Sequence, residues 1–160
     1  MALKRYLVQA TDGVKMDAYA TTVMERGGMC FHATGAFLPE MDAATNIVSY
    51  PTIVSGKVPA GILLHTTENY DTTRVPKNEQ NQDIVPLNSK VAYLVDGEVI
   101  TNMIQPSRLS SIVPGKAYVT NSGLFTDSVP TTSGSVDVFT AKFKSGPSVD
   151  GYVKVSVKMA

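Results

Sequence analysis

Two runs of β-branched and aromatic residues flank the dipeptide Asp96-Gly97 in the middle of the chain, over residues 90–104. Asp-Gly accepts the positive φ angles of a two-residue type I′ turn, whose twist matches antiparallel strands. The pattern therefore predicts a hairpin that turns at this dipeptide and brings Val95 opposite Glu98. Apolar residues fall on both sides of the ribbon, which is typical of strands covered on both faces. We expect this hairpin to be a central scaffold.

The last run of the chain has the clearest alternation of apolar and polar positions. Its apolar positions are Val153, Val155, Val157 and Met159, and its polar side carries Tyr152, Lys154, Ser156 and Lys158. A period of two is typical of a half-solvated antiparallel strand. Similar alternation predicts a strand at 136–144, a further strand is predicted at 117–120, residues 29–32 form a short strand-like run, and short runs follow at 47–50 and 62–64.

Glycine-containing pairs separate these runs. Asp150-Gly151 precedes the last strand as a turn, like Asp96-Gly97. Gly27-Gly28 lets the backbone turn or pack closely before the next strand. The same pair ends almost at once the helix that would compete over residues 21–26.

Strands separated by turn signals roughly every ten residues, with no convincing long helix, predict an all-β fold. We expect a single barrel or sandwich-like domain of antiparallel hairpins with little helix. The chain divides into an N-terminal extended arm or hairpin, residues 1–20, and a β-domain, residues 21–160, defined most clearly over 52–160. The polar segment 69–83 is expected to be an ordered surface excursion.

Composition narrows the choice of partners. The 160 residues are 43% hydrophobic, enough for one packed domain, but only 18% charged, against roughly 25% in an ordinary soluble domain. A surface so poor in charge is consistent with coverage by protein partners. The 14 basic and 14 acidic residues give a net charge of zero without any block of like charge. We therefore expect no nucleic-acid partner and no anionic membrane partner.

Neither a membrane span nor a disulfide framework is predicted. No apolar run approaches membrane-spanning length. Basic residues near the N-terminus precede only a few apolar ones, too few for the apolar region of a signal peptide. Cys30 is the single cysteine, so the fold does not depend on an oxidising compartment.

Cys30 and His32 form the spacing that a metal site or a Cys–His nucleophile would use. Zinc requires about four ligands, whereas the chain holds one Cys and two His. A nucleophile would also need an orienting group and oxyanion donors, and none is evident. The favoured interpretation is a small buried thiol beside a strand histidine.

Other candidate chemistry also has a simpler explanation. His65 precedes Thr66 without a Gly-x-Ser-x-Gly elbow. Asp71 and Arg74 lie three apart in a polar loop, where a local Asx turn or a modest ion pair is the usual role. Phosphate-binding glycine loops are absent. We expect no enzyme activity, no catalytic residue, no cofactor and no metal.

Several short motifs, in their order and spacing, resemble those of a family of tailed-phage virion proteins, the head decoration or capsid cement proteins. They are Met24-Glu25-Arg26-Gly27-Gly28, residues 54–64, Asp71-Thr72-Thr73-Arg74 with the Asn/Gln-rich loop after it, residues 89–102, residues 115–123, and the ending 150–155. The motifs are distributed over most of the chain. Residues 1–20 and 139–149 depart from the family's pattern.

The resemblance implies a non-enzymatic protein, made in the bacterial host, that binds the outer surface of an assembled phage capsid and stabilises it against internal pressure. Its partners would be the major capsid protein and further copies of itself, as a dimer or trimer. The expected contact residues come from the arm and the polar loop, and they are Leu3, Arg5, Tyr6, Asp71, Arg74 and Lys77. A virion-displayed module that binds a receptor or glycan is the alternative, and it would require surface tyrosines, of the seven in the chain, to cluster in one groove.

Overall fold

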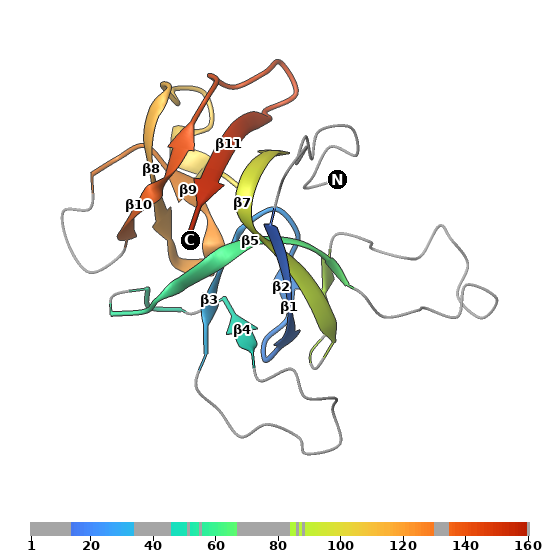
Figure 1. Ribbon diagram of the computed structural model, residues 1–160. Coiled ribbons are helices and arrows are strands. Elements are labelled where there is room, and N and C mark those ends of the chain that lie inside the picture. The colour runs from blue at the N-terminus through green and yellow to red at the C-terminus, as the bar shows by residue number, and fades with distance from the viewer. Residues whose placement is uncertain are drawn as a thin grey trace.

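The fold was examined in a computed structural model (Figure 1). The structure describes residues 14–33, 46–50, 52–54, 56–66, 84–85, 87, 89–129 and 135–159. Its strands are β1 Val14–Ala20, β2 Met24–Glu25, β3 Met29–His32, β4 Ile47–Ser49, β5 Pro59–Thr66, β6 Ile84–Val85, β7 Lys90–Thr101, β8 Gly115–Thr120, β9 Phe125–Thr126, β10 Ser135–Phe143 and β11 Val153–Lys158. Two short 3-10 turns, η1 Pro106–Arg108 and η2 Asn121–Gly123, complete the described elements. The all-β prediction is confirmed.

The predicted central hairpin is wrong, because β7 runs through Asp96-Gly97 as one strand of 12 residues. Its first half pairs with β1 and β5, and its second half pairs with β11. Glu98 lies opposite Ser156 of β11, whereas the predicted hairpin would have placed it opposite Val95. These long-range ladders satisfy backbone groups that a hairpin would have paired locally. Gly97, with φ of 145°, accommodates the bend at which β7 passes from one set of partners to the other.

Five strands form a closed ring, which we call the N-terminal barrel. The ring runs β1–β4–β3–β5–β7 and closes through the pairing of β7 with β1. All its pairings are antiparallel except β1 with β4, which is parallel. The interior is filled by a cluster that includes three alanines, Cys30 and Tyr93. Small residues suit a barrel of so few strands, because its interior is narrow.

The remaining strands continue the same sheet in the order β7–β11–β10–β8–β9. A bridge between Ile104 and Phe125 connects β9 back to the chain just after β7. We call this part the C-terminal barrel, and its core contains Phe125, Phe143 and the three inward valines of β11. The alternation predicted for the last strand is confirmed, since Val153, Val155 and Val157 are buried and the residues between them are partly exposed.

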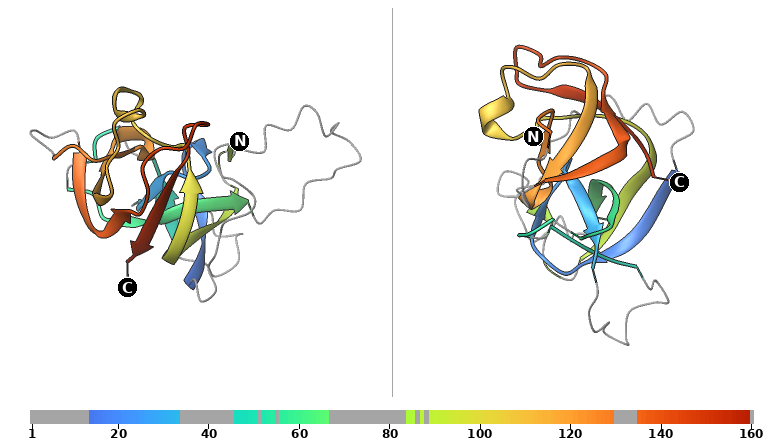
Figure 2. Two further views of the ribbon diagram at one scale, coloured as in Figure 1. Left: turned by 90° about the horizontal axis from the view of Figure 1, so that it is seen from above. Right: turned by 90° about the vertical axis from the view of Figure 1, so that its left-hand side faces the viewer.

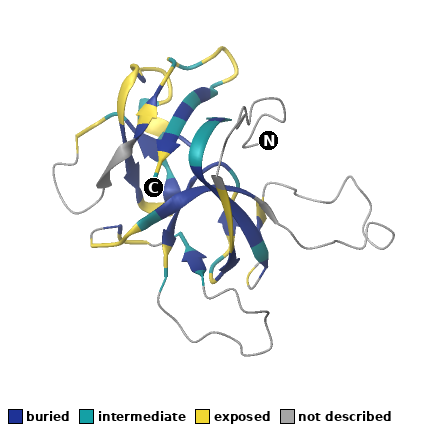
Figure 3. Ribbon diagram, in the orientation of Figure 1, coloured by how far each residue is buried: buried dark blue, intermediate teal, exposed yellow. Residues whose placement is uncertain are grey.

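Strands β3, β5 and β7 separate the two cores and are buried on both faces (Figure 3). On β7, Leu94 and Val99 face the C-terminal core, while Tyr93 and Val95 face the N-terminal core. The two-sided burial predicted for this stretch is therefore observed, although the turn is not.

The N-terminal segment is only partly described. Residues 14–20, which the sequence grouped with the arm, form β1 inside the main sheet. Residues 1–13 and the polar segment 69–83 lie outside the described residues. No helix covers residues 21–26, where β2 forms instead.

Candidate interaction groove

The thiol that a metal or nucleophile hypothesis would use is enclosed in the N-terminal barrel. Cys30 is fully buried, and its thiol donates to the carbonyl oxygen of Gly61 over 3.1 Å. Burial raises the pKa of the Cys30 thiol to about 12. The thiol is therefore protonated at neutral pH and inaccessible, as expected for a structural cysteine.

His32 does not combine with Cys30 into a reactive pair. It is exposed and contacts the Tyr93 ring edge-on, with 6.4 Å between ring centroids. His65 belongs to β5, but its side chain lies outside the described part of the structure. Among the residues that the structure describes, no three His, Cys, Asp or Glu side chains gather as metal ligands would, and no helix is long and apolar enough to cross a membrane.

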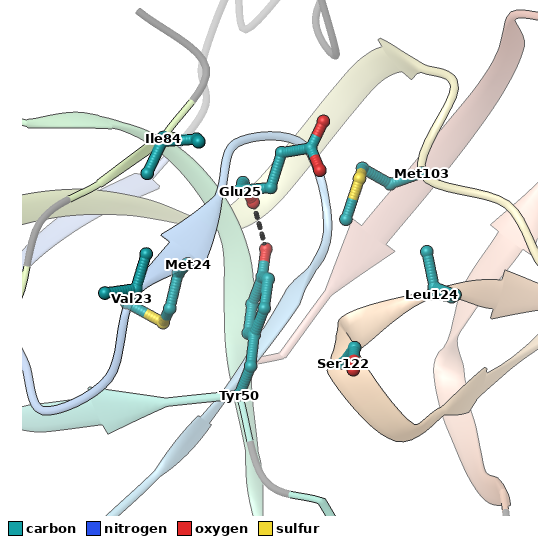
Figure 4. Close-up of a pocket in the computed structure, with 8 residues that line it drawn as sticks. All are labelled: Val23, Met24, Glu25, Tyr50, Ile84, Met103, Ser122 and Leu124. Carbon is teal, nitrogen blue, oxygen red and sulfur yellow. Dashed lines mark hydrogen bonds between the residues drawn. The ribbon is translucent and has the colours of Figure 1, made fainter. Parts of the chain in front are cut away.

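A groove of about 460 Å³ opens where the two barrels meet (Figure 4). Strands β2 and β6, which pair as a separate two-stranded sheet, form one wall, and η2 with the segment after β7 forms the other. The lining side chains are Val23, Met24, Glu25, Tyr50, Ile84, Met103, Ser122 and Leu124. Five of these are apolar, and Val23 and Ile84 are 63% and 43% exposed. The groove thus combines apolar side chains with polar groups from Glu25, Tyr50 and Ser122.

Tyr50 holds the floor of the groove in place. Its hydroxyl donates to the backbone carbonyl of Glu25 (Figure 4), and its backbone N–H donates to the Thr22 hydroxyl over 3.1 Å. Burial, followed by the nearby Cys30 thiol, raises the pKa of the Tyr50 hydroxyl well above its usual value. The hydroxyl is therefore a permanent donor that ties β2 to the segment after β4.

Two glycines allow the walls to approach. A Cβ atom on Gly28 would lie 2.8 Å from the carbonyl oxygen of Gly123, and one on Gly123 would lie 2.6 Å from that of Met29. Gly27, with φ of 95°, makes the turn that leads from β2 to this contact. The pair at 27–28 therefore serves both as a turn and as a close approach.

Ser122 at the rim has a left-handed backbone, with φ of 59° and ψ of 20°. This conformation is uncommon for residues other than glycine. With Gly123, it lets β8 turn sharply and presents the Ser122 side chain to the groove (Figure 4).

Arg108 of η1 forms an ion pair with Asp127, which follows β9. The Arg108 guanidinium donates to both carboxylate oxygens of Asp127, over 2.7 and 2.9 Å. These hydrogen bonds lower the pKa of Asp127.

At Asp150-Gly151, the turn before β11 closes with a 2.9 Å hydrogen bond from the Gly151 N–H to the carbonyl of Ser148.

The contact residues expected from the sequence, Leu3, Arg5, Tyr6, Asp71, Arg74 and Lys77, all lie outside the described residues. The groove itself was not foreseen, because its lining comes from segments far apart in the chain. The local sequence motifs that lie near the groove are the glycine pair at 27–28 and the Asn-Ser-Gly turn at 121–123. Ile84, on its β6 wall, directly follows the predicted contact loop 69–83.

The described tyrosines do not gather in one place. Tyr19, Tyr93 and Tyr118 are buried, and of the described tyrosines only Tyr50 lines the groove. This distribution gives no support to a glycan-stacking site among the described residues.

No protein-family model and no curated protein matches the chain. A solved structure of the capsid of Myoviridae Phage XM1 contains a chain with the same fold, at a TM-score of 0.61 and 13% sequence identity. The alignment covers 99% of this chain and 92% of that one. The likeness therefore extends through both barrels, and at this identity it concerns the fold.

Proposed function

We propose that this chain is a structural protein of a tailed-phage virion that binds the outer surface of the assembled capsid and stabilises the shell as a decoration or cement protein. It acts without catalysis, and its partners are the major capsid protein and further copies of itself. The observation that carries the proposal is the shared fold over almost the whole length of a chain found in a phage capsid. The ordered sequence motifs point independently to virion decoration.

The surface chemistry supports a role based on contact area. Only 18% of the residues are charged, and some of those charges neutralise each other, as Lys154 does with Glu98 at 2.6 Å. Large apolar side chains remain exposed on both barrels, among them Val23, Ile53, Val58, Val113, Val129 and Val149. Each of these side chains alone offers a small contact area. On a symmetric shell, many identical weak contacts add up through multivalency.

The direct test uses capsids that lack the protein. Purified protein is added, and co-sedimentation measures binding while DNA release on heating measures stability. We expect saturable binding and a higher release temperature. Arg74→Glu, in the predicted contact loop, should weaken binding, whereas Lys57→Glu, exposed before β5, serves as the matched charge-reversal control. Failure to bind, with unchanged heat stability of the shell, would contradict the proposal.

Oligomeric state is a second measurement. Sedimentation equilibrium of the purified chain is expected to show a dimer or trimer, because symmetric decoration requires self-contact or a symmetric shell site. A chain that is monomeric both in solution and on the capsid would remove the homo-oligomer from the proposal while leaving capsid binding intact.

A further inference from the structure

The outer face of the C-terminal barrel gathers lysines from three separate segments of the chain. Strands β8, β10 and β11 lie side by side there (orange to red in Figure 2). Their inward side chains, among them Ala117, Phe143 and Val155, belong to the C-terminal core. Because side chains alternate along a strand, the residues between these inward ones point away from the core. Five of the outward residues form what we call the lysine face, and they are Lys116, Lys142, Lys144, Lys154 and Lys158.

The strand register brings these lysines close together. Lys142 of β10 lies directly opposite Lys116 of β8, and the backbone N–H of Lys144 donates to the carbonyl of Lys154 over 2.8 Å. Lys158 follows on the same side of β11. Neighbouring strands lie about 4.8 Å apart and successive residues of one face about 7 Å apart, so the five Cα atoms fall within about 15 Å of each other. Adjacent charges are therefore within the screening length of about 10 Å at 0.1 M salt.

The lysine face is accessible to a partner. Lys154 is partly exposed, and the other four lysines are exposed. Like charges directly opposite each other across two strands repel and weaken a sheet, as Lys116 and Lys142 do. Anionic groups of a partner would relieve this repulsion while forming contacts of their own. The face is thus built to receive negative charge.

Acidic residues lie at the borders of the lysine face. On β7, Asp96 and Glu98 run beside β11, and Glu98 pairs with Lys154 over 2.6 Å. On β10, Asp137 occupies a register position beyond Lys142. A basic centre with acidic borders complements a surface of mixed charge in the opposite order, which is what a folded protein presents. A uniform polyanion such as duplex DNA would meet repulsion at these borders.

The type of cation also favours a protein partner. All five cations of the face are lysines, which act as flexible point charges, whereas arginine recognises phosphate through two parallel hydrogen bonds. The net charge of the chain is zero, so no long-range field draws it toward a nucleic acid. Local complementarity with clustered carboxylates remains the best match.

We propose that the lysine face docks on an acidic patch of the capsid shell. The identity of the partner rests on the proposed function, whereas the layout of charges specifies the chemistry of the patch. Carboxylates of the shell lie against Lys142 and Lys144 at the centre of the face, and basic groups of the shell approach Asp96 and Glu98. Such complementarity fixes the orientation of each copy, and the contacts of many copies add up on a symmetric shell.

Paired charge neutralisations test the face on capsids that lack the protein. Lys142→Gln combined with Lys144→Gln removes two charges from the centre of the face. The matched control, Lys15→Gln combined with Lys57→Gln, removes two charges that are also exposed but belong to other parts of the surface. We expect the first double variant to bind about three- to thirtyfold more weakly in co-sedimentation, as for the loss of two ion pairs. The control should bind like the unmodified protein.

The outcomes separate this proposal from the proposed function. If the unmodified protein binds and both double variants bind equally well, the lysine face is not the contact and the proposal is overturned. If the unmodified protein itself does not bind, the proposed function fails and the proposal fails with it. Thermal unfolding is measured alongside, and Lys142→Gln should melt no lower than the unmodified protein, because it relieves the repulsion with Lys116.

Salt and DNA distinguish the two classes of anionic partner. Binding of the unmodified protein to capsids should weaken as salt is added, and more steeply than binding of the Lys142→Gln, Lys144→Gln variant. Duplex DNA, added as a competitor, should leave the protein on the shell. Displacement by DNA of the unmodified protein, but not of the double variant, would overturn docking on an acidic protein surface and assign the face to nucleic acid.

Discussion

The two barrels share β7 but are held together in different ways. In the C-terminal barrel, β8 leads into β9 through the short turn η2, and the core contains Phe125, Phe143 and several valines. The N-terminal barrel contains β4, a strand of three residues, and its core contains several small side chains. The N-terminal barrel is therefore stabilised less by bulky apolar side chains than the C-terminal barrel.

The largest effect is expected from deleting an aromatic ring in the C-terminal core. Phe125 is fully buried and meets Phe143 edge-on, with ring centroids 6.4 Å apart. Phe125→Ala should lower the free energy of unfolding by about 3–5 kcal/mol. Cys30→Ala, in the N-terminal core, removes one atom and should lower it by about 1 kcal/mol. Urea denaturation measures both, and equal losses would contradict the contrast between the cores.

The contact between the barrels is tested at Gly123. Gly123 and Gly56 have nearly the same φ, 72° and 73°, but a Cβ atom would clash only at Gly123. Gly123→Ala should destabilise the fold by about 2–4 kcal/mol, through left-handed backbone strain and overpacking. Gly56→Ala carries only the strain, about 1 kcal/mol. If the two variants melt alike, the close approach of η2 to β3 does not contribute to stability.

Acid should weaken the C-terminal barrel at Asp127. Because Arg108 lowers the pKa of Asp127 in the folded state, this pair stabilises the fold fully above the unfolded-state pKa of about 3.9. The stabilisation is lost as the pH falls from there through the lower folded-state pKa. In the Asp127→Asn variant this dependence should disappear. Unfolding curves between neutral and strongly acidic pH measure it, and parallel pH profiles of variant and parent would refute the assignment.

The smallest effects are expected at two ion pairs that each contain one residue of β7. Lys154 and Glu98 approach to 2.6 Å in the C-terminal barrel, whereas Lys90 and Asp17 are 4.0 Å apart in the N-terminal barrel. Exposed pairs contribute roughly 0.2–1 kcal/mol. Double-mutant cycles should place the first pair toward the upper end of this range and the second near its lower end. If the Lys90–Asp17 pair has the larger coupling free energy, the N···O distance does not govern the strength of these ion pairs.

The sequence by itself determined the all-β class and the elements whose signal is local. Alternation over residues 153–159 identified β11, and Asp150-Gly151 marked the turn before it, because side-chain period and backbone preference are properties of neighbouring residues. The sequence also indicated that Cys30 is a buried structural thiol, because one Cys and two His are too few for a zinc site. The apolar positions on both sides of residues 90–104 indicated a strand covered on both faces.

Only the tertiary structure decided how β7 continues, which strands close each barrel, and where the groove lies. Asp96-Gly97 has the preference of a turn, yet a turn preference is small beside the pairing of a 12-residue strand with β1, β5 and β11. The parallel pairing of β1 with β4 and the meeting of Gly28 with Gly123 join residues far apart in sequence. No local pattern encodes such contacts, because their free energy arises only when the distant partner is already in place.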